Sequence, residues 1–158
     1  MKKYELTNET TTAGNGQVLY RIKALVDIGD DVKAGDLGGY VAGEGNLSHE
    51  GNAWVYGDAS VYGNARVYDN AMVYGDAMVS QTDDYLYVAP IGSRNASITF
   101  CRTKTGISVH CGCFDGTLEE FDARVKETHG DNEYGQVYRH LIEIAKLRIK
   151  VRKEENNE

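Results

Sequence analysis

The chain has 158 residues with 24 acidic and 17 basic side chains, which give a formal net charge of −7. No segment approaches the ~20 consecutive apolar residues of a membrane-spanning helix. Polar residues follow Lys2 and Lys3, where a signal peptide would place an apolar core. We therefore expect a cytoplasmic protein that does not associate with a membrane.

Positive charge is concentrated toward the C-terminus, where five cations follow one another closely: Lys146, Arg148, Lys150, Arg152 and Lys153. The rest of the chain is strongly acidic. Nucleic-acid binding requires cations that displace the counterions of phosphates, so we expect no nucleic-acid partner. An acidic body is compatible with a partner protein that presents a basic surface.

The N-terminal residues 1–30 are expected to form a β segment. Its strands lie over 4–6 and 17–26, and 8–16 is a turn-rich connection. The glycine-dense stretch 35–40 follows, and it lacks the lysine and the spacing of a phosphate-binding loop. We interpret it as a structural entry turn to the segment that comes next.

A six-residue repeat occupies the middle of the chain. A valine begins each unit and an alanine holds the fifth position: Val55, Val61, Val67, Val73 and Val79, with Ala59, Ala65, Ala71 and Ala77. Self-similarity at a fixed period is typical of a solenoid. Each unit predicts a short strand and a corner, and three units close a coil. We therefore expect residues 31–82 to form a short left-handed parallel β-helix with the valines inside.

The second position of each unit is a tyrosine: Tyr56, Tyr62, Tyr68 and Tyr74. These side chains are expected to point outward, with Tyr56 and Tyr74 stacked on one face because three units separate them. Exposed tyrosines favour interfaces, since they offer a large contact area at a low entropic cost. We expect them to contribute to self-association or partner binding; the alternative is simple cross-strand stacking on a solvated wall.

Residues 83–158 predict an α+β module, so the chain as a whole is expected to be mainly β with this module at its C-terminal end. Three strands are expected over 85–89, 97–102 and 107–111. Thr117 and Glu120 form a capping box that opens a helix to about Thr128, and a second helix is expected over 132–146. Residues 147–153 fit either an extension of that helix or an edge strand.

Two groups of residues could carry chemistry. His49 is the one histidine of the coil region and is the candidate base of an acyltransferase, although a surface histidine is the simpler interpretation. Cys101, Cys111 and Cys113 could bind zinc, but their spacing does not match paired zinc knuckles, so we interpret them as core thiols. We therefore expect no catalytic residue, no metal and no cofactor.

Several segments carry a resemblance to a known family: Asp36–Val41, Asn46–Ser48, the Val-Tyr-Gly-Asn-Ala units, Ile91–Arg94, Gly112–Thr117 and Thr128–Asn132. Together they resemble phage and prophage hexapeptide-repeat proteins, which are often labelled as transferases or polymer-forming cytoskeletal proteins. The resemblance covers nearly the whole chain. It implies a left-handed β-helix and a phage-encoded accessory protein acting in the cytoplasm of the host cell, whereas a shared fold does not imply transferase activity.

The hypothesis that follows is a non-enzymatic binding protein, homo-oligomeric, that inhibits or sequesters a host factor or defence component. Ser93 and Arg94 are the candidate binding residues of the C-terminal module, because a guanidinium in a glycine-flanked loop suits a carboxylate or phosphate. An internal salt bridge of Arg94 is the alternative. Two other functions remain open: a reduced acyltransferase that uses His49, and an oligomeric sponge that holds an anionic nucleotide signal near Ser93, Arg94 and the basic tail.

Overall fold

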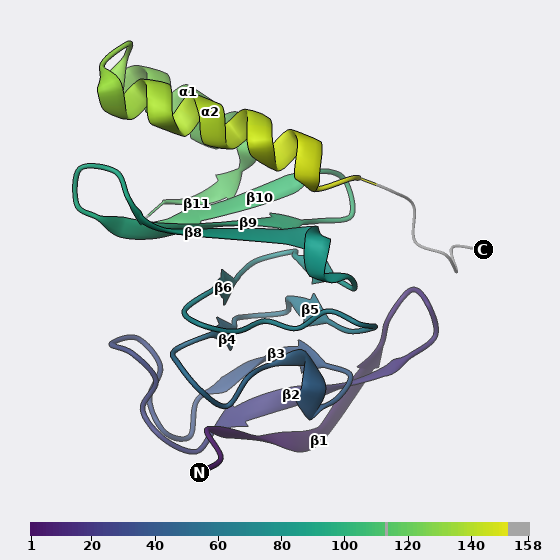
Figure 1. Ribbon diagram of the computed structural model, residues 1–158. Coiled ribbons are helices and arrows are strands. Elements are labelled where there is room, and N and C mark those ends of the chain that lie inside the picture. The colour runs from purple at the N-terminus through teal and green to yellow at the C-terminus, as the bar shows by residue number, and fades with distance from the viewer. Residues whose placement is uncertain (113, 152–158) are drawn as a thin grey trace.

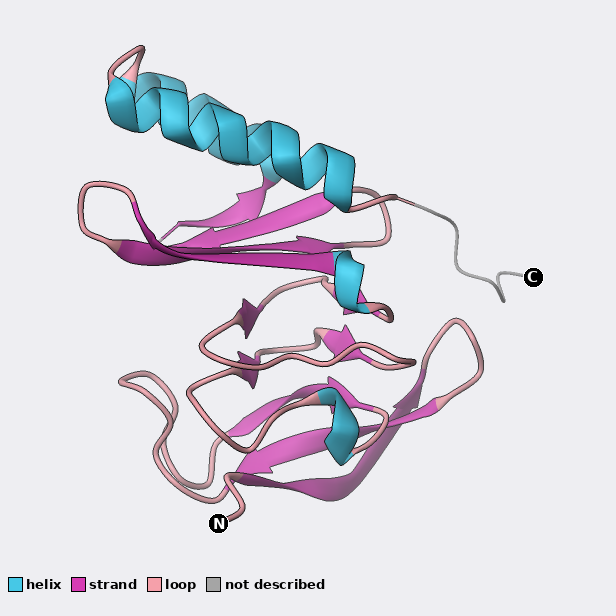
Figure 2. Ribbon diagram, in the orientation of Figure 1, coloured by secondary structure: helices cyan, strands magenta, loops and turns pink. Residues whose placement is uncertain are grey.

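The computed structural model describes residues 1–112 and 114–151, which form three sheets and two α-helices (Figures 1 and 2). The strands are β1 (Tyr4–Thr12), β2 (Val18–Ala24), β3 (Leu37–Val41), β4 (Trp54–Val55), β5 (Ser60–Val61), β6 (Met72–Val73), β7 (Met78–Val79), β8 (Tyr85–Ile91), β9 (Ala96–Arg102), β10 (Ile107–Cys111) and β11 (Phe114–Thr117). The helices are α1 (Leu118–His129) and α2 (Glu133–Arg148), with short 3-10 turns η1 (Glu44–Asn46) and η2 (Thr82–Asp84).

The expectation of a left-handed β-helix as the fold class is wrong. The described residues form a five-stranded mixed sheet in the order β1-β2-β3-β5-β7, a two-stranded parallel sheet β4-β6, and a four-stranded antiparallel sheet β11-β10-β9-β8. The difference arises at β3, which pairs antiparallel with β2 and parallel with β5. The first strands of the chain thereby join the repeat in one mixed sheet instead of standing beside a separate solenoid.

Within the repeat, parallel strands of two residues pair with strands three units further along the chain. Trp54 lies opposite Met72, and Ser60 lies opposite Met78. Backbone bonds follow the same spacing, and the N–H of Tyr56 donates to the carbonyl of Val73 at 2.8 Å. The valines that begin each unit are completely buried, so the period correctly predicts which side chains face inward.

The N-terminal strands are longer than the sequence indicates. β1 continues through Thr12, across residues expected to form a turn, and its pairing with β2 is interrupted by an irregularity between Leu6 and Thr10. Lys3 precedes this strand and is almost fully buried, with its ammonium group donating to the carbonyl of Ala53 at 2.7 Å. The hairpin is therefore fixed directly to the repeat.

In the C-terminal module, the three expected strands and both expected helices are confirmed with small shifts of their ends. The Thr117 hydroxyl accepts from the N–H of Glu120 at 3.0 Å, and the Glu120 carboxylate accepts from the N–H of Thr117 at 2.9 Å. Of the residues left open between helix and strand, Leu147 and Arg148 extend α2, and 149–151 belong to neither a helix nor a strand. The cap residue Ile149 is buried. Strand β11 was not anticipated, and 152–153 lie outside the described residues.

The antiparallel sheet separates two cores. On one face, Phe100, Phe121 and Leu141 belong to a cluster between the sheet and the helices. On the other face, Tyr85 and Cys101 join the core of the repeat. The sheet therefore acts as a wall shared by the two halves of the chain.

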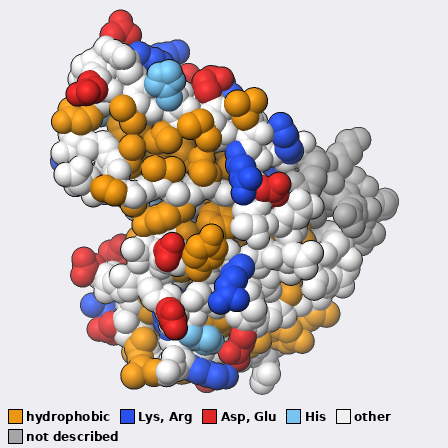
Figure 3. All heavy atoms as spheres, viewed as in Figure 1, with side chains coloured by type: hydrophobic (Ala, Val, Ile, Leu, Met, Phe, Trp, Pro, Cys, Tyr) orange, Lys and Arg blue, Asp and Glu red, His pale blue; other side chains and the backbone are white. Residues whose placement is uncertain are grey.

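The surface of the module carries apolar side chains between α2 and β8 (Figure 3). Ile144 and Leu147 of α2 are 48% and 73% exposed. No helix in the described part of the chain is long and apolar enough to span a membrane.

Candidate functional site

A half-open cavity of about 360 Å³ lies at one end of the C-terminal module. We call it the turn pocket and define it by six of its lining residues: Ile91, Ser93, Arg94, Arg124, His129 and Tyr138. Its walls come from the β8–β9 turn, the β10–β11 turn, and the facing surfaces of α1 and α2. The pocket therefore forms only when segments far apart in the sequence fold together.

The β8–β9 turn holds Ser93 and Arg94 at its tip. Gly92 (φ 78°) and Asn95 (φ 51°) adopt left-handed backbone conformations, which glycine and asparagine tolerate best. The N–H of Asn95 donates to the carbonyl of Gly92 at 3.2 Å and closes the turn. The local sequence thus dictates a tight turn that presents Ser93 and Arg94 to the pocket.

The cations of the turn pocket are Arg94 of the β8–β9 turn and Arg124 of α1. Arg94 is exposed, and within residues 1–112 and 114–151 it forms no ion pair and no hydrogen bond, so the internal salt bridge considered as its alternative is not seen among these residues. The Arg124 guanidinium lies 5.4 Å from the ring centroid of Phe114. His129 occupies the last turn of α1. No carboxylate is among the described residues that line this pocket, although the chain as a whole is acidic.

An aromatic wall faces these cations. The ring of Phe121 lies 5.4 Å from that of Phe114 and 5.5 Å from that of Tyr138. The His129 imidazole stacks on Tyr138 with a centroid distance of 5.7 Å. Because the faces of these rings are apolar, the wall suits a planar or hydrophobic group, while the arginines suit a negative one.

The Tyr138 hydroxyl lies deep beside the β8–β9 turn. A Cβ added to Gly92 would collide with it, so the turn approaches the helix as closely as a glycine allows. Burial, followed by the neighbouring Cys111 thiol, raises the pKa of Tyr138 to about 12. The phenol therefore stays neutral at physiological pH.

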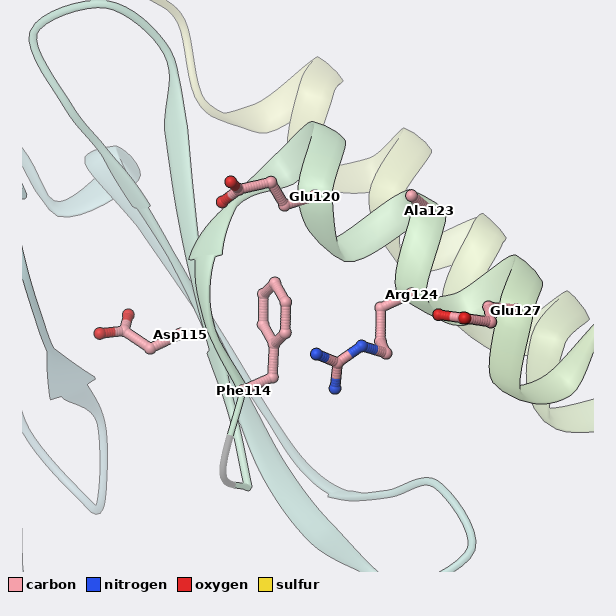
Figure 4. Close-up of a pocket in the computed structure, with 6 residues that line it drawn as sticks. All are labelled: Phe114, Asp115, Glu120, Ala123, Arg124 and Glu127. Atoms are coloured by element: carbon pink, nitrogen blue, oxygen red, sulfur yellow. The ribbon is translucent and has the colours of Figure 1, made fainter.

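A second hollow of about 490 Å³ lies on the other side of Phe114 and Arg124. Figure 4 shows the Arg124 guanidinium directed toward the Phe114 ring, with Asp115, Glu120 and Glu127 around the same space. Three carboxylates and one guanidinium give this hollow an acidic character. Charge therefore distinguishes the two cavities, and the turn pocket is the one that suits an anion.

The tyrosines of the repeat have different environments. Tyr56 and Tyr74 stack as expected, with ring centroids 4.0 Å apart, and Tyr74 stacks in turn on His110 of β10 at 3.8 Å. Tyr62 is 1% exposed, so the expectation of an exposed tyrosine at this position is wrong. Tyr62 packs with Ala13 and Leu19 of the N-terminal hairpin in a cluster separate from the core of the repeat, which accounts for its burial. Tyr68 is 45% exposed and is the most accessible of the four.

His49 has a structural environment. Its Nδ1 accepts from the backbone N–H of Lys3 at 3.1 Å, its Nε2 lies 2.9 Å from a Glu44 oxygen, and its ring stacks on Tyr4 at 4.2 Å. Both ring nitrogens are therefore engaged. This geometry favours the interpretation of His49 as a residue that fixes the start of β1.

The two cysteines that the structure describes, Cys101 and Cys111, do not come together. Cys101 belongs to the core of the repeat, whereas Cys111 packs on the opposite face of the sheet against the helix core. Burial raises the pKa of the Cys101 thiol to about 12, which keeps it protonated. Cys113 lies outside the described residues. The structure thus fits the interpretation of Cys101 as a core thiol.

Sequence reasoning found Ser93 and Arg94 but missed Arg124 and Tyr138 as site residues. Both residues lie on predicted helices. The sequence indicates which face of each helix is buried, but it does not indicate which end of the sheet each helix covers. His129 was identified only as a helix-terminal residue. No spacing rule links these positions, because the pocket depends on how α1 and α2 cross the sheet.

Comparisons with known proteins add no relative: no protein-family model matches the chain, and no curated protein matches it.

Proposed function

We propose that the protein is a non-enzymatic binding protein whose turn pocket holds an anionic ligand with an aromatic ring, of the nucleotide class. The observation that carries the proposal is the pairing of Arg94 and Arg124 with an aromatic wall in a pocket whose described lining includes no carboxylate. In a chain with a net charge of −7, such a local excess of positive charge favours an anion.

The phosphate and the base of a nucleotide would each match a different part of the turn pocket. Arg94 lies free of the described ion pairs at the rim, where its planar guanidinium suits bidentate contact with a phosphate. Phe114 and Tyr138 provide apolar surface for a base. The cavity, about 360 Å³, falls within the range of about 300–1,000 Å³ typical of small-molecule sites.

The biological setting that we propose is sequestration by a phage-encoded accessory protein in a host cell. This setting rests on the resemblance of the sequence to phage and prophage proteins. A protein that holds a nucleotide signal without converting it lowers the free concentration of that signal. The acyltransferase alternative is weaker, since it depends on His49, whose ring nitrogens are both engaged.

The test is isothermal titration calorimetry with a panel of nucleoside monophosphates, nucleoside diphosphates and cyclic nucleotides. We expect saturable binding of at least one member. Because a charged hydrogen bond contributes about 1.5–3 kcal/mol, Arg94→Gln and Arg124→Gln should each weaken binding by roughly tenfold or more.

Arg66→Gln is the matched control, because Arg66 is also exposed but lies in the repeat beside Tyr68 and Asp69. We expect its affinity to equal that of the unmodified protein. The absence of saturable binding across the panel would contradict the proposal. Equal losses in Arg66→Gln and Arg94→Gln would also contradict it, since the effect would then reflect net charge alone.

A further inference from the structure

The side of the C-terminal module formed by β8 and α2 has an open sheet edge. β8 is the last strand in the order β11-β10-β9-β8, and it pairs with β9 only. In an antiparallel strand, alternate residues direct their N–H and C=O groups away from the existing partner. Over Tyr85–Val88, where the register with β9 is regular, the outer edge of β8 therefore presents backbone donors and acceptors that can pair with another strand. Pro90, further along β8, has no N–H to donate.

α2 runs alongside this edge in the opposite direction to β8. Arg148, at the end of the helix, lines a groove together with Leu86 and Tyr87 at the start of the strand. Tyr138, nearer the start of the helix, lines the turn pocket together with Ile91 at the end of the strand. Helix and strand thus form one side of the module, and apolar side chains gather between them (Figure 3).

This side leaves apolar surface uncovered. Ile144 and Leu147 lie three positions apart on α2, so they share a helix face, and they are 48% and 73% exposed. Leu86 and Val88 of β8 are only partly buried against the helix core. An open strand edge beside exposed apolar side chains is a surface that natural proteins normally cover.

We propose that this surface, consisting of β8 together with Ile144 and Leu147 of α2, pairs with the same surface of a second copy of the chain. Two β8 strands would align antiparallel across a two-fold axis and join the two four-stranded sheets. The backbone edge is self-complementary in this arrangement, because each strand offers the donors that the other accepts.

The spacing of helices and strands favours the same arrangement. α1 contacts β10 and β11, and α2 lies toward β8, so each helix covers about half of the four-stranded sheet. Two strand spacings amount to about 9.6 Å, close to the about 8–10 Å between packed helix axes. Extending the sheet through β8 therefore brings the two copies of α2 to contact distance without distorting either module.

The last turns of α2 lie close to the centre of the proposed pair. Because Leu86 lies near Arg148, a two-fold axis through the middle of β8 passes close to the last turns of α2. Leu147 and Ile144 of the two copies then meet near this axis. The exposed apolar side chains of one copy would thus cover those of the other.

The test uses the full-length chain in sedimentation equilibrium. We expect a dimer at tens of micromolar, and we expect the double variant Ile144→Glu/Leu147→Glu to raise the dimer dissociation constant by roughly a hundredfold or more. Both positions are exposed on a helix, and glutamate is a good helix former, so circular dichroism should show an unchanged fold. Leu37→Glu is the matched control: Leu37 is 56% exposed but lies on β3, and this variant should remain dimeric.

Hydrogen exchange separates pairing through the strand from contact through the helices alone. The outward-facing amides of β8 should be protected in the dimer and should exchange faster after dilution or in the double variant. A monomer at tens of micromolar would overturn the proposal. A dimer that the double variant leaves intact, or one whose β8 amides exchange at the same rate in both forms, would also overturn it.

Discussion

The repeat and the C-terminal module bury their cores in different ways. Most interior positions of the repeat are valine or alanine, with Val61, Val67 and Val73 fully buried. Its strands have only two residues and are joined by backbone bonds to the next layer. The module has strands of four to seven residues and an aromatic core under two helices. A uniform repeat offers few distinctive surfaces, whereas the varied module holds the turn pocket.

The two regions meet at a buried ion pair, and breaking it should have the largest effect. Arg102 and Asp84 are each 1% exposed, with Nε and Oδ2 3.3 Å apart, and the Asp84 carboxylate also accepts from the N–H groups of Ser80 and Gln81. Arg102→Met removes this guanidinium from a buried carboxylate. We expect a loss of about 3–5 kcal/mol in the free energy of unfolding, measured by urea denaturation.

The double variant Arg102→Met/Asp84→Asn is the control for buried charge. It removes the carboxylate charge together with the guanidinium, so it should be more stable than Arg102→Met alone. If the two variants are equally destabilised, lost packing rather than the uncompensated charge accounts for the effect.

The repeat contains matched positions that sharpen the comparison. Gly57 and Gly63 hold the third position of their units with φ values of 58° and 60°. A Cβ at Gly63 would lie 2.5 Å from the Ser80 carbonyl oxygen, whereas a Cβ at Gly57 meets nothing within 4 Å. Gly57→Ala should cost about 1 kcal/mol from backbone strain, and Gly63→Ala about 2–4 kcal/mol. If both variants lose the same free energy in thermal or urea unfolding, the close approach of the Ser80 carbonyl to Gly63 does not contribute to stability.

The smallest effect concerns the aromatic stack that links the module to the repeat. Burial lowers the pKa of His110 below its ordinary value of 6.5, against the opposing influence of Asp115 and Asp31. The folded state therefore binds this proton less readily than the unfolded state. The stability that neutral His110 contributes is fully present above pH 6.5 and is lost as the pH falls through the lowered pKa.

We expect the free energy of unfolding to decrease from pH 7.5 to 5.5, and His110→Phe to reduce that decrease, because phenylalanine can stack on Tyr74 without titrating. His140→Gln, an exposed position on α2, should leave the pH dependence unchanged. The free energy of unfolding is measured by urea denaturation at pH 7.5 and at pH 5.5. A decrease of the same size in His110→Phe would assign the pH dependence to other groups.

Signals from neighbouring residues predicted the strands and helices of the C-terminal module better than they predicted the sheet pairing of the repeat. The capping box of Thr117 and Glu120 placed the start of α1, because that signal depends only on neighbouring residues. The valine period predicted the buried positions of the repeat, but it did not predict that β3 would pair with both β2 and β5. Sheet order depends on long-range pairing, which a period cannot specify.

The candidate site shows the same limit. Arg94 could be selected from its glycine-flanked turn, which is a local feature. Arg124 and Tyr138 reach the pocket only because α1 and α2 cover the sheet at a particular angle, which no spacing indicates. The burial of Tyr62 was missed because the N-terminal hairpin covers it from outside the repeat.

The most direct test of the central claim is a chemical-shift titration of the uniformly ¹⁵N-labelled protein with the nucleotide that binds most tightly in calorimetry. The claim predicts that the shifted amides cluster in the β8–β9 turn around Arg94, in the β10–β11 turn before Phe114, and at the end of α1 near His129. Shifts confined to the groove around Tyr68 and Asp69, or no saturable shifts, would contradict it.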